Sequence, residues 1–167
     1  IAGGCSRRRP LKSLNLYMRK NRYGDDKMEY PIFPWREEDD YTRLKLRNSG
    51  QDYGQTYFRD GIIQSMLHDK VDIDLQAYRP AVVYINGEYW GMLNIREHMS
   101  TDYIERNHDV DKDEIDMLKY PGVEWQQTKA GTDSDYQRLL NYAATNDLSD
   151  STHYSYMEEH MDINEFL

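Results

Sequence analysis

Alternation of apolar and polar residues marks two short segments near the start of the chain as half-buried strands. From residue 13 to 19 every second residue is apolar, and from 42 to 47 two leucines alternate with three basic residues. Successive side chains of a strand point to opposite faces, so each pattern places one face against a core and the other toward water. The sequence therefore predicts strands at about 13–19 and 42–47.

A helical pattern follows the second predicted strand. Between residues 56 and 68, apolar residues recur three or four positions apart, which gathers their side chains on one face of a helix. The residues in this pattern are Phe58, Ile62, Ile63, Met66 and Leu67. We expect a helix over about 56–68 that packs on the sheet.

The stretch RPAVVYINGEYWGMLNIREHM, residues 79–99, predicts a β-hairpin. Asn86 and Gly87 separate two runs rich in β-branched and aromatic residues, and Asn-Gly is a preferred pair for a two-residue hairpin turn. The returning run ends in the charged cluster Arg96-Glu97-His98. We expect the hairpin to be scaffold along most of its length and to carry a site only at this end.

The remainder of the chain is predicted to be mostly helical. The expected elements are a helix begun by Ser100 or Thr101, a brief strand at 113–120, a helix from Thr132, Asp133 or Ser134 to about Asn146, a short helix capped by Ser149, and the start of a helix in DINEFL. The strands do not alternate with helices, so we expect an α+β fold in which an antiparallel sheet precedes a helical part.

Composition narrows the classes of function. The chain of 167 residues has a formal net charge of -9, so no overall positive field would attract a nucleic-acid backbone, and we expect no nucleic-acid partner. Tyrosine is abundant, with 15 residues against three phenylalanines. Because tyrosine joins an apolar ring to a polar tip, it suits half-exposed surfaces that recognise proteins or carbohydrates.

The chain carries no stretch of about 20 apolar residues, the length that a membrane-spanning helix requires, so we expect no transmembrane segment. It begins at Ile1 within a loop-like sequence and ends where a helix is expected to start. We therefore expect it to be a fragment of a longer protein.

Several segments together resemble the CotH kinase family, named after spore-coat protein H. The segments, which occur in the order found in the family and cover nearly the whole chain, are CSRRRPLKSLNLYMR, YTRLKLRNSGQDYGQTYFRDGIIQSML, RPAVVYINGEYWGMLNIREHMSTDYI, DKDEIDMLK, DLSD and MDINEFL. The resemblance implies a protein-kinase-like fold with ATP between two lobes. Residues 1–98 would form the N-lobe-like antiparallel sheet with an αC-like helix, and residues 99–167 the beginning of a mostly helical C-lobe.

The resemblance also implies a group of nucleotide-binding residues. Lys12 follows a Gly/Ser/Arg loop and opens a strand, so its ammonium would reach a phosphate, and Ser6 and Arg7 of the same loop would touch phosphates too. A solvated lysine at a strand start is the alternative for Lys12. Arg47 belongs to the family-like segment LRNSGQD, in which Asn48 and Asp52 shape a turn or take part in the site.

Two acidic residues complete the predicted site. Asp60 and its neighbour Arg59 lie on the αC-like helix, where one of them would orient the phosphate-binding lysine; alternatively they pair with each other or with Arg47 as structural ions. Glu97, at the end of the hairpin, would orient the cleft or hold the ribose. No metal ligand is assigned within the chain.

The expected activity is transfer of phosphate from ATP, with Mg²⁺ or another divalent metal, to Ser/Thr of secreted, coat or cell-surface proteins by the full-length protein. The catalytic and metal-binding residues are expected beyond Leu167. Since phosphoryl transfer depends on positioning and charge neutralisation, this fragment alone is expected to be inactive. The alternative is a non-catalytic surface module, pseudokinase-like or carbohydrate- or host-binding, that uses its tyrosine-rich face.

Overall fold

The computed structural model describes residues 1–37, 39–119 and 127–166, and the chain divides into two compact units, Ile1–Met99 and Ser100–Leu167. Tyr120 and Leu167, with which two of the predicted elements end, lie outside the described residues. Each unit is described by itself. The combination of antiparallel sheets with several helices confirms the predicted α+β class.

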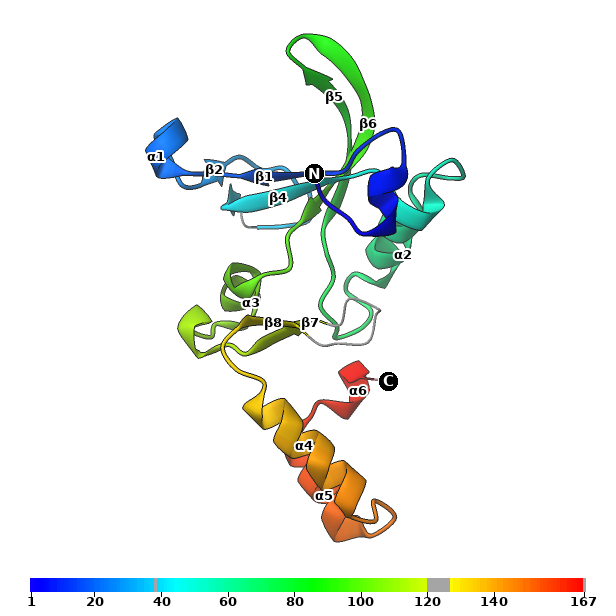
Figure 1. Cartoon of the computed structure of the whole chain (residues 1–167), viewed down its shortest axis with the longest axis vertical. Coiled ribbons are helices and arrows are strands. Elements are labelled where there is room, and N and C mark those ends of the chain that lie inside the picture. The colour runs from blue at the N-terminus through cyan, green and yellow to red at the C-terminus, as the bar shows by residue number, and fades with distance from the viewer. Residues whose placement is uncertain (38, 120–126, 167) are drawn as a thin grey trace. The chain divides into compact units, whose positions relative to one another are not determined.

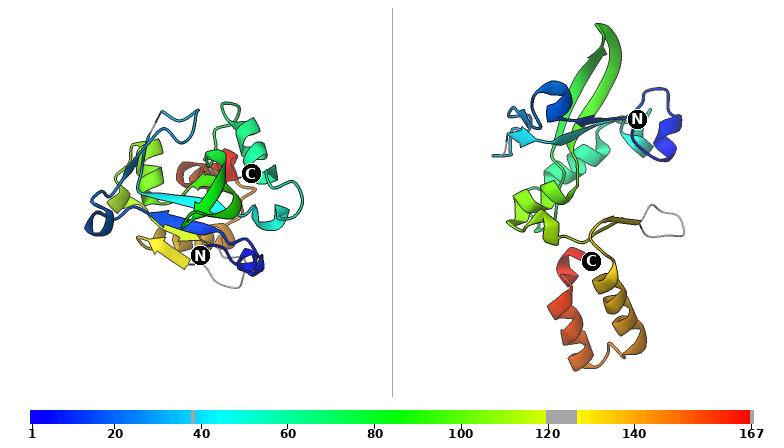
Figure 2. Two further views of the ribbon diagram at one scale, coloured as in Figure 1. Left: turned by 90° about the horizontal axis from the view of Figure 1, so that it is seen from above. Right: turned by 60° about the vertical axis from the view of Figure 1, so that its left-hand side comes forward.

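Unit 1 is built on a four-stranded antiparallel sheet (Figures 1 and 2). In spatial order its strands are β1 (Leu14–Tyr17), β4 (Arg43–Arg47), β6 (Glu88–Glu97) and β5 (Tyr78–Ile85). Leu14 and Leu16 lie opposite Leu46 and Leu44, so the apolar alternation of the two predicted strands meets on one face. Both hairpin strands join these two strands in one antiparallel sheet, which agrees with the antiparallel sheet expected from the sequence.

The hairpin turns at Asn86 and Gly87, as predicted. Both residues have positive φ, 54° and 83°, the backbone conformation that this type of two-residue turn requires. Strand β6 pairs with β4 only through Asn94–Glu97, whereas its pairing with β5 runs from Glu88 to Arg96 with one irregularity in register. The distal part of the hairpin therefore extends beyond β4, as Figure 1 shows.

The segment between β1 and β4, for which the sequence predicts no regular element, supplies much of the core of unit 1. It contains α1 (Lys20–Tyr23) and a small pair of strands, β2 (Met28–Glu29) and β3 (Asp40–Tyr41). The buried cluster consists of Ile32, Phe33, Tyr41, Leu44 and Ala77. This mostly irregular segment thus covers the face of the sheet that carries Leu16 and Leu44, and no periodic pattern in the sequence predicts this contact.

Helix α2 (Arg59–Leu67) occupies the predicted place but begins later than expected. Its apolar side chains do not form a buried stripe, since Ile62, Ile63 and Met66 are 45%, 50% and 63% exposed. The contact with the sheet is made by Gly61, where an added Cβ would lie 2.5 Å from the Tyr78 ring of β5. The helix therefore approaches the sheet through its smallest residue.

Unit 2 combines helices with one two-stranded antiparallel sheet, β7–β8. Its elements are α3 (Thr101–His108), a 3-10 helix η3 (Lys112–Glu114), β7 (Met117–Lys119), β8 (Gln127–Ala130), α4 (Ser134–Thr145), α5 (Ser151–His160) and α6 (Ile163–Phe166).

The predicted helices of unit 2 are present, but the cap of α5 is corrected. Asp150, and not Ser149, accepts a hydrogen bond from the Thr152 backbone N–H, at 2.8 Å. Ser149 instead donates its hydroxyl to Asp147. Among the described residues, no helix is both long and apolar enough to cross a bilayer.

Candidate functional site

Lys12 holds the loop that precedes β1. The chain there forms a 3-10 turn, η1 (Cys5–Arg8), and the Lys12 Nζ donates hydrogen bonds of 2.8 Å to the carbonyls of Arg7 and Arg9. The ammonium thus binds the backbone of the loop in which Ser6 is half-buried and Arg7 exposed. The structure brings these three predicted residues together, while their binding to phosphate stays a prediction.

Asn48 connects this loop to the sheet. It is 1% exposed and follows β4 directly. Its side-chain NH₂ donates to the carbonyls of Leu11, at 2.7 Å, and Ser6, at 3.4 Å. Its side-chain oxygen accepts from the Ser13 hydroxyl, at 2.9 Å, and from the Gly50 N–H, at 3.2 Å. One buried amide therefore fixes the loop, the start of β1 and the turn after β4.

Arg47, Asp60 and Arg96 form an ion cluster between the sheet and α2. The Asp60 carboxylate lies 3.2 Å from the Arg47 guanidinium of β4 and 2.8 Å from that of Arg96 on β6. Arg96 is 1% exposed, and burial lowers the pKa of its guanidinium while Asp60 raises it. Of the alternatives open for Asp60, the structure shows pairing with Arg47 and not with Lys12.

Asp52 fixes the start of α2. It lies in η2 (Gly50–Asp52), is 5% exposed, and accepts hydrogen bonds from the Thr56 hydroxyl at 2.6 Å and the Arg59 N–H at 3.1 Å. These hydrogen bonds, led by that from Thr56, lower the pKa of the Asp52 carboxyl. Its negative charge also lies at the helix N-terminus, which such a charge stabilises. Asp52 therefore positions the helix that carries Asp60.

Glu97 lies in a separate network. It is 2% exposed and accepts hydrogen bonds from the Arg36 guanidinium, at 2.9 Å, and from the Ala77 N–H, at 2.8 Å. Arg96 and Glu97 are adjacent in β6, so their side chains leave opposite faces of the sheet. The structure consequently does not bring Glu97 together with Arg47 and Asp60. Its contacts are those of a buried structural ion pair with Arg36.

A comparison with protein families identifies the family to which the chain belongs. The family model for CotH kinase protein matches residues 1–167, which is the entire sequence. The chain belongs to the CotH kinase protein family. No curated protein and no solved structure matches it. In this CotH chain, the segment LRNSGQD supplies Arg47, Asn48 and Asp52, and the segment FRDG supplies Asp60, so two family-like motifs meet in one ion pair and one helix cap.

Arg96 belongs to the charged cluster at the end of the hairpin where a site was expected, but the sequence assigned it no role of its own. It lies directly opposite Lys45, on the same face of the sheet as Arg47. Alternation along β6 would have placed Arg96 and Glu97 on opposite faces. The register that puts Arg96 beside α2 rather than over the core depends on pairing across the sheet, which the sequence does not display.

The metal implied by the CotH family has no counterpart in the described part of the chain, where no three His, Cys, Asp or Glu side chains gather closely enough to hold a metal ion. The acidic groups nearest the candidate site, Asp52 and Asp60, already bind arginines and backbone N–H groups. The donor set around the loop and β4 is cationic, which fits phosphate and not a metal ion.

Proposed function

We propose that this chain forms the nucleotide-binding part of a CotH-like atypical protein kinase, which transfers phosphate from ATP to Ser/Thr of secreted, coat or cell-surface proteins. Membership of the CotH family supports a kinase-like fold with ATP as the phosphate donor. The observation that carries the proposal is the ion pair between Arg47 of β4 and Asp60 of α2, at 3.2 Å.

The ion pair has the arrangement that phosphate binding in a kinase-like lobe requires. In protein kinases, a basic residue on a sheet strand binds the phosphates and is oriented by a carboxylate on the helix αC. Here β4 is followed along the chain by α2, and the Asp60 carboxylate holds both Arg47 and Arg96. Two guanidiniums share one carboxylate, so the cluster keeps an excess of positive charge.

Arg47 is the member of this cluster that would reach a ligand. Its side chain is 37% exposed, whereas that of Arg96 is 1% exposed. A guanidinium stays charged at all physiological pH values and binds two phosphate oxygens at once. Asp60 and Arg96 would therefore orient Arg47, and Arg47 would contact the phosphates.

The loop before β1 would supply the remaining phosphate contacts. The Lys12 ammonium has three N–H donors and uses two of them for loop carbonyls. We propose that it shapes the loop of Ser6 and Arg7 and directs its third donor to a phosphate. A bound divalent ion would neutralise charge on the phosphates, and we assign no described residue of this chain to it.

Calorimetric titration of the intact protein with ATP in the presence of Mg²⁺ tests the proposal. We expect Arg47→Gln and Lys12→Ala each to weaken ATP binding by about tenfold or more, because each removes a charged hydrogen bond. Lys70→Gln, which removes an exposed charge outside the site, serves as the matched control and should bind ATP like the parent. ATP affinity that is unchanged in both site variants would overturn the assignment.

A second candidate function, a non-catalytic surface interaction module, is favoured by the hairpin. Val82, Tyr84 and Tyr89 in its distal part are 59%, 63% and 65% exposed, and the two tyrosine rings meet at 5.8 Å. Exposed tyrosines of this kind suit protein or carbohydrate recognition. Retained partner binding by an intact protein that binds no ATP would favour this module over the kinase.

A further inference from the structure

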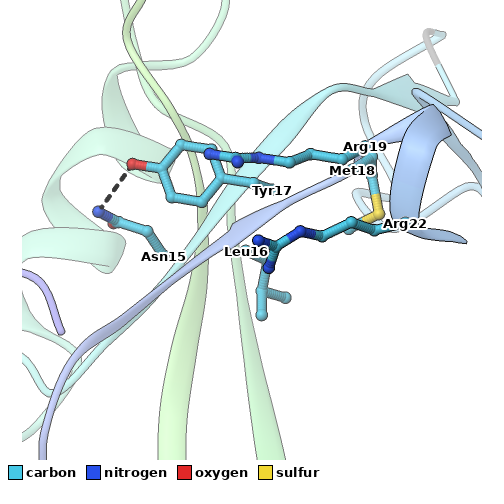
Figure 3. Close-up of a pocket in the computed structure, with 6 residues that line it drawn as sticks. All are labelled: Asn15, Leu16, Tyr17, Met18, Arg19 and Arg22. Atoms are coloured by element: carbon cyan, nitrogen blue, oxygen red, sulfur yellow. Dashed lines mark hydrogen bonds between the residues drawn. The ribbon is translucent and has the colours of Figure 1, made fainter.

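An arginine-lined pocket lies along β1. It has a volume of about 440 Å³ and is lined by residues 15–19 together with Arg22 of α1 (Figure 3). The Arg19 guanidinium lies 5.7 Å from the centre of the Tyr17 ring, and that of Arg43, directly opposite on β4, lies 5.6 Å from it. One exposed aromatic ring thus holds two guanidiniums beside a third cationic residue.

These arginines have no acidic partner among the described residues. Within the part of the chain that the structure describes, Arg19, Arg22 and Arg43 form no ion pair, although the sequence contains 30 Asp and Glu residues. Arg19 and Arg43 flank one ring, and Arg22 lines the same pocket as Arg19, so an anion bound there would be attracted by several positive charges. No acidic side chain among residues 1–37, 39–119 and 127–166 pairs with these arginines, so the pocket suits a negatively charged ligand from outside.

The ligand would also need hydrogen-bond donors. Asn15 donates its amide to the Tyr17 hydroxyl at 3.4 Å, but its side-chain oxygen is buried and accepts no hydrogen bond from any described residue. Strand β1 is moreover the edge strand, paired on one side only with β4. An extended peptide has backbone N–H groups for this edge and for the Asn15 oxygen, which a free anion lacks.

We infer that this pocket binds a phosphorylated peptide segment, which lies in extended form along the edge of β1 and places its phosphate among Arg19, Arg22 and Arg43. A phosphate on Ser or Thr carries nearly two negative charges and three acceptor oxygens, which match several guanidiniums better than a single carboxylate does. The site uses none of the residues proposed for ATP, and it stands whether or not the protein is a kinase.

Fluorescence anisotropy with a labelled peptide that contains one phosphoserine tests the inference. The unphosphorylated peptide, the same peptide with Glu in place of phosphoserine, and inorganic phosphate as a competitor form the comparison arms. We expect the double variant Arg19→Gln/Arg22→Gln to weaken phosphopeptide binding by about tenfold or more. Lys70→Gln is the matched control, and thermal unfolding checks that the exposed substitutions leave the fold intact.

The comparison peptides and inorganic phosphate distinguish recognition of a phosphorylated peptide from binding of phosphate alone or of any peptide. Tighter binding of the phosphopeptide than of inorganic phosphate and of both other peptides supports the inference. Equal binding of all three peptides, or no effect of the double variant, overturns it. Displacement of the phosphopeptide by ATP would also overturn it, because the pocket would then belong to the nucleotide. Arg47→Gln should weaken ATP binding and leave phosphopeptide binding unchanged, which distinguishes failure here from failure of the proposed function.

Discussion

Asn48 shows how much of the candidate site depends on single side chains. The predicted phosphate-binding residues Ser6, Arg7 and Lys12 lie in a loop without regular secondary structure beyond one 3-10 turn. Asn48 holds the ends of that loop through the carbonyls of Ser6 and Leu11, and it immediately follows Arg47 in sequence. The same amide therefore determines where the loop lies relative to the ion pair.

We expect Asn48→Ala to lower the free energy of unfolding of unit 1 by about 3 kcal/mol, because it leaves several buried hydrogen-bonding groups without partners. Urea unfolding monitored by circular dichroism measures the change. Asn21→Ala, at an exposed residue of α1, should change stability by less than about 0.5 kcal/mol. A loss at Asn48 no larger than that of this control would show that the network contributes little.

At the scale of elements, α2 depends on Asp52 for its N-terminus. Phe58, the residue before the helix, makes no side-chain cap, and Asp52 supplies the missing acceptor from six residues earlier. The pKa of Asp52 lies below its ordinary value of 3.8, so the folded state favours the carboxylate. The resulting stabilisation is present above about pH 4 and is lost as the pH falls through the lowered pKa.

We therefore expect Asp52→Asn to be less stable than the parent at neutral pH, and the difference to shrink as the pH falls below about 4. Urea unfolding of both proteins between pH 2 and pH 7 measures this difference. Thr56→Val, which removes the first cause of the lowered pKa, should shift the loss of stability to higher pH. A difference in stability that stays constant with pH would contradict the role assigned to Asp52. Asp72→Asn, at an exposed residue, is the control and should show no pH-dependent difference in stability from the parent.

Elements with a periodic or turn signature were predictable from the sequence, and the contacts between them were not. Alternation located β1 and β4, and Asn86-Gly87 fixed the hairpin. The apolar residues of the segment that carries Phe33 and Tyr41 follow neither helical nor strand periodicity. Its contribution to the core could therefore not be predicted from the sequence. The sequence does not determine the partner of Asp60, because that partner depends on strand register and on where α2 meets the sheet.

At the scale of the whole molecule, charge is divided unequally between the two units. Residues 1–99 contain 16 Lys and Arg against 14 Asp and Glu, whereas residues 100–167 contain 5 against 16, giving net charges of +2 and -11. The two candidate anion sites, for nucleotide and for phosphopeptide, both lie in the unit with positive net charge. An overall charge of -9 therefore hides a unit suited to anionic ligands.

This division predicts different responses of the two units to salt. The like charges of unit 2 repel one another and destabilise its compact state, and added salt screens that repulsion. We expect 0.5 M NaCl to increase amide hydrogen-exchange protection in α4 and α5 of unit 2. The sheet of unit 1 should change little, because screening there weakens attractive ion pairs as well as repulsion. Sorbitol, which carries no charge, is the control and should protect both units alike. Equal gains in both units with NaCl would show that charge repulsion does not limit the stability of unit 2.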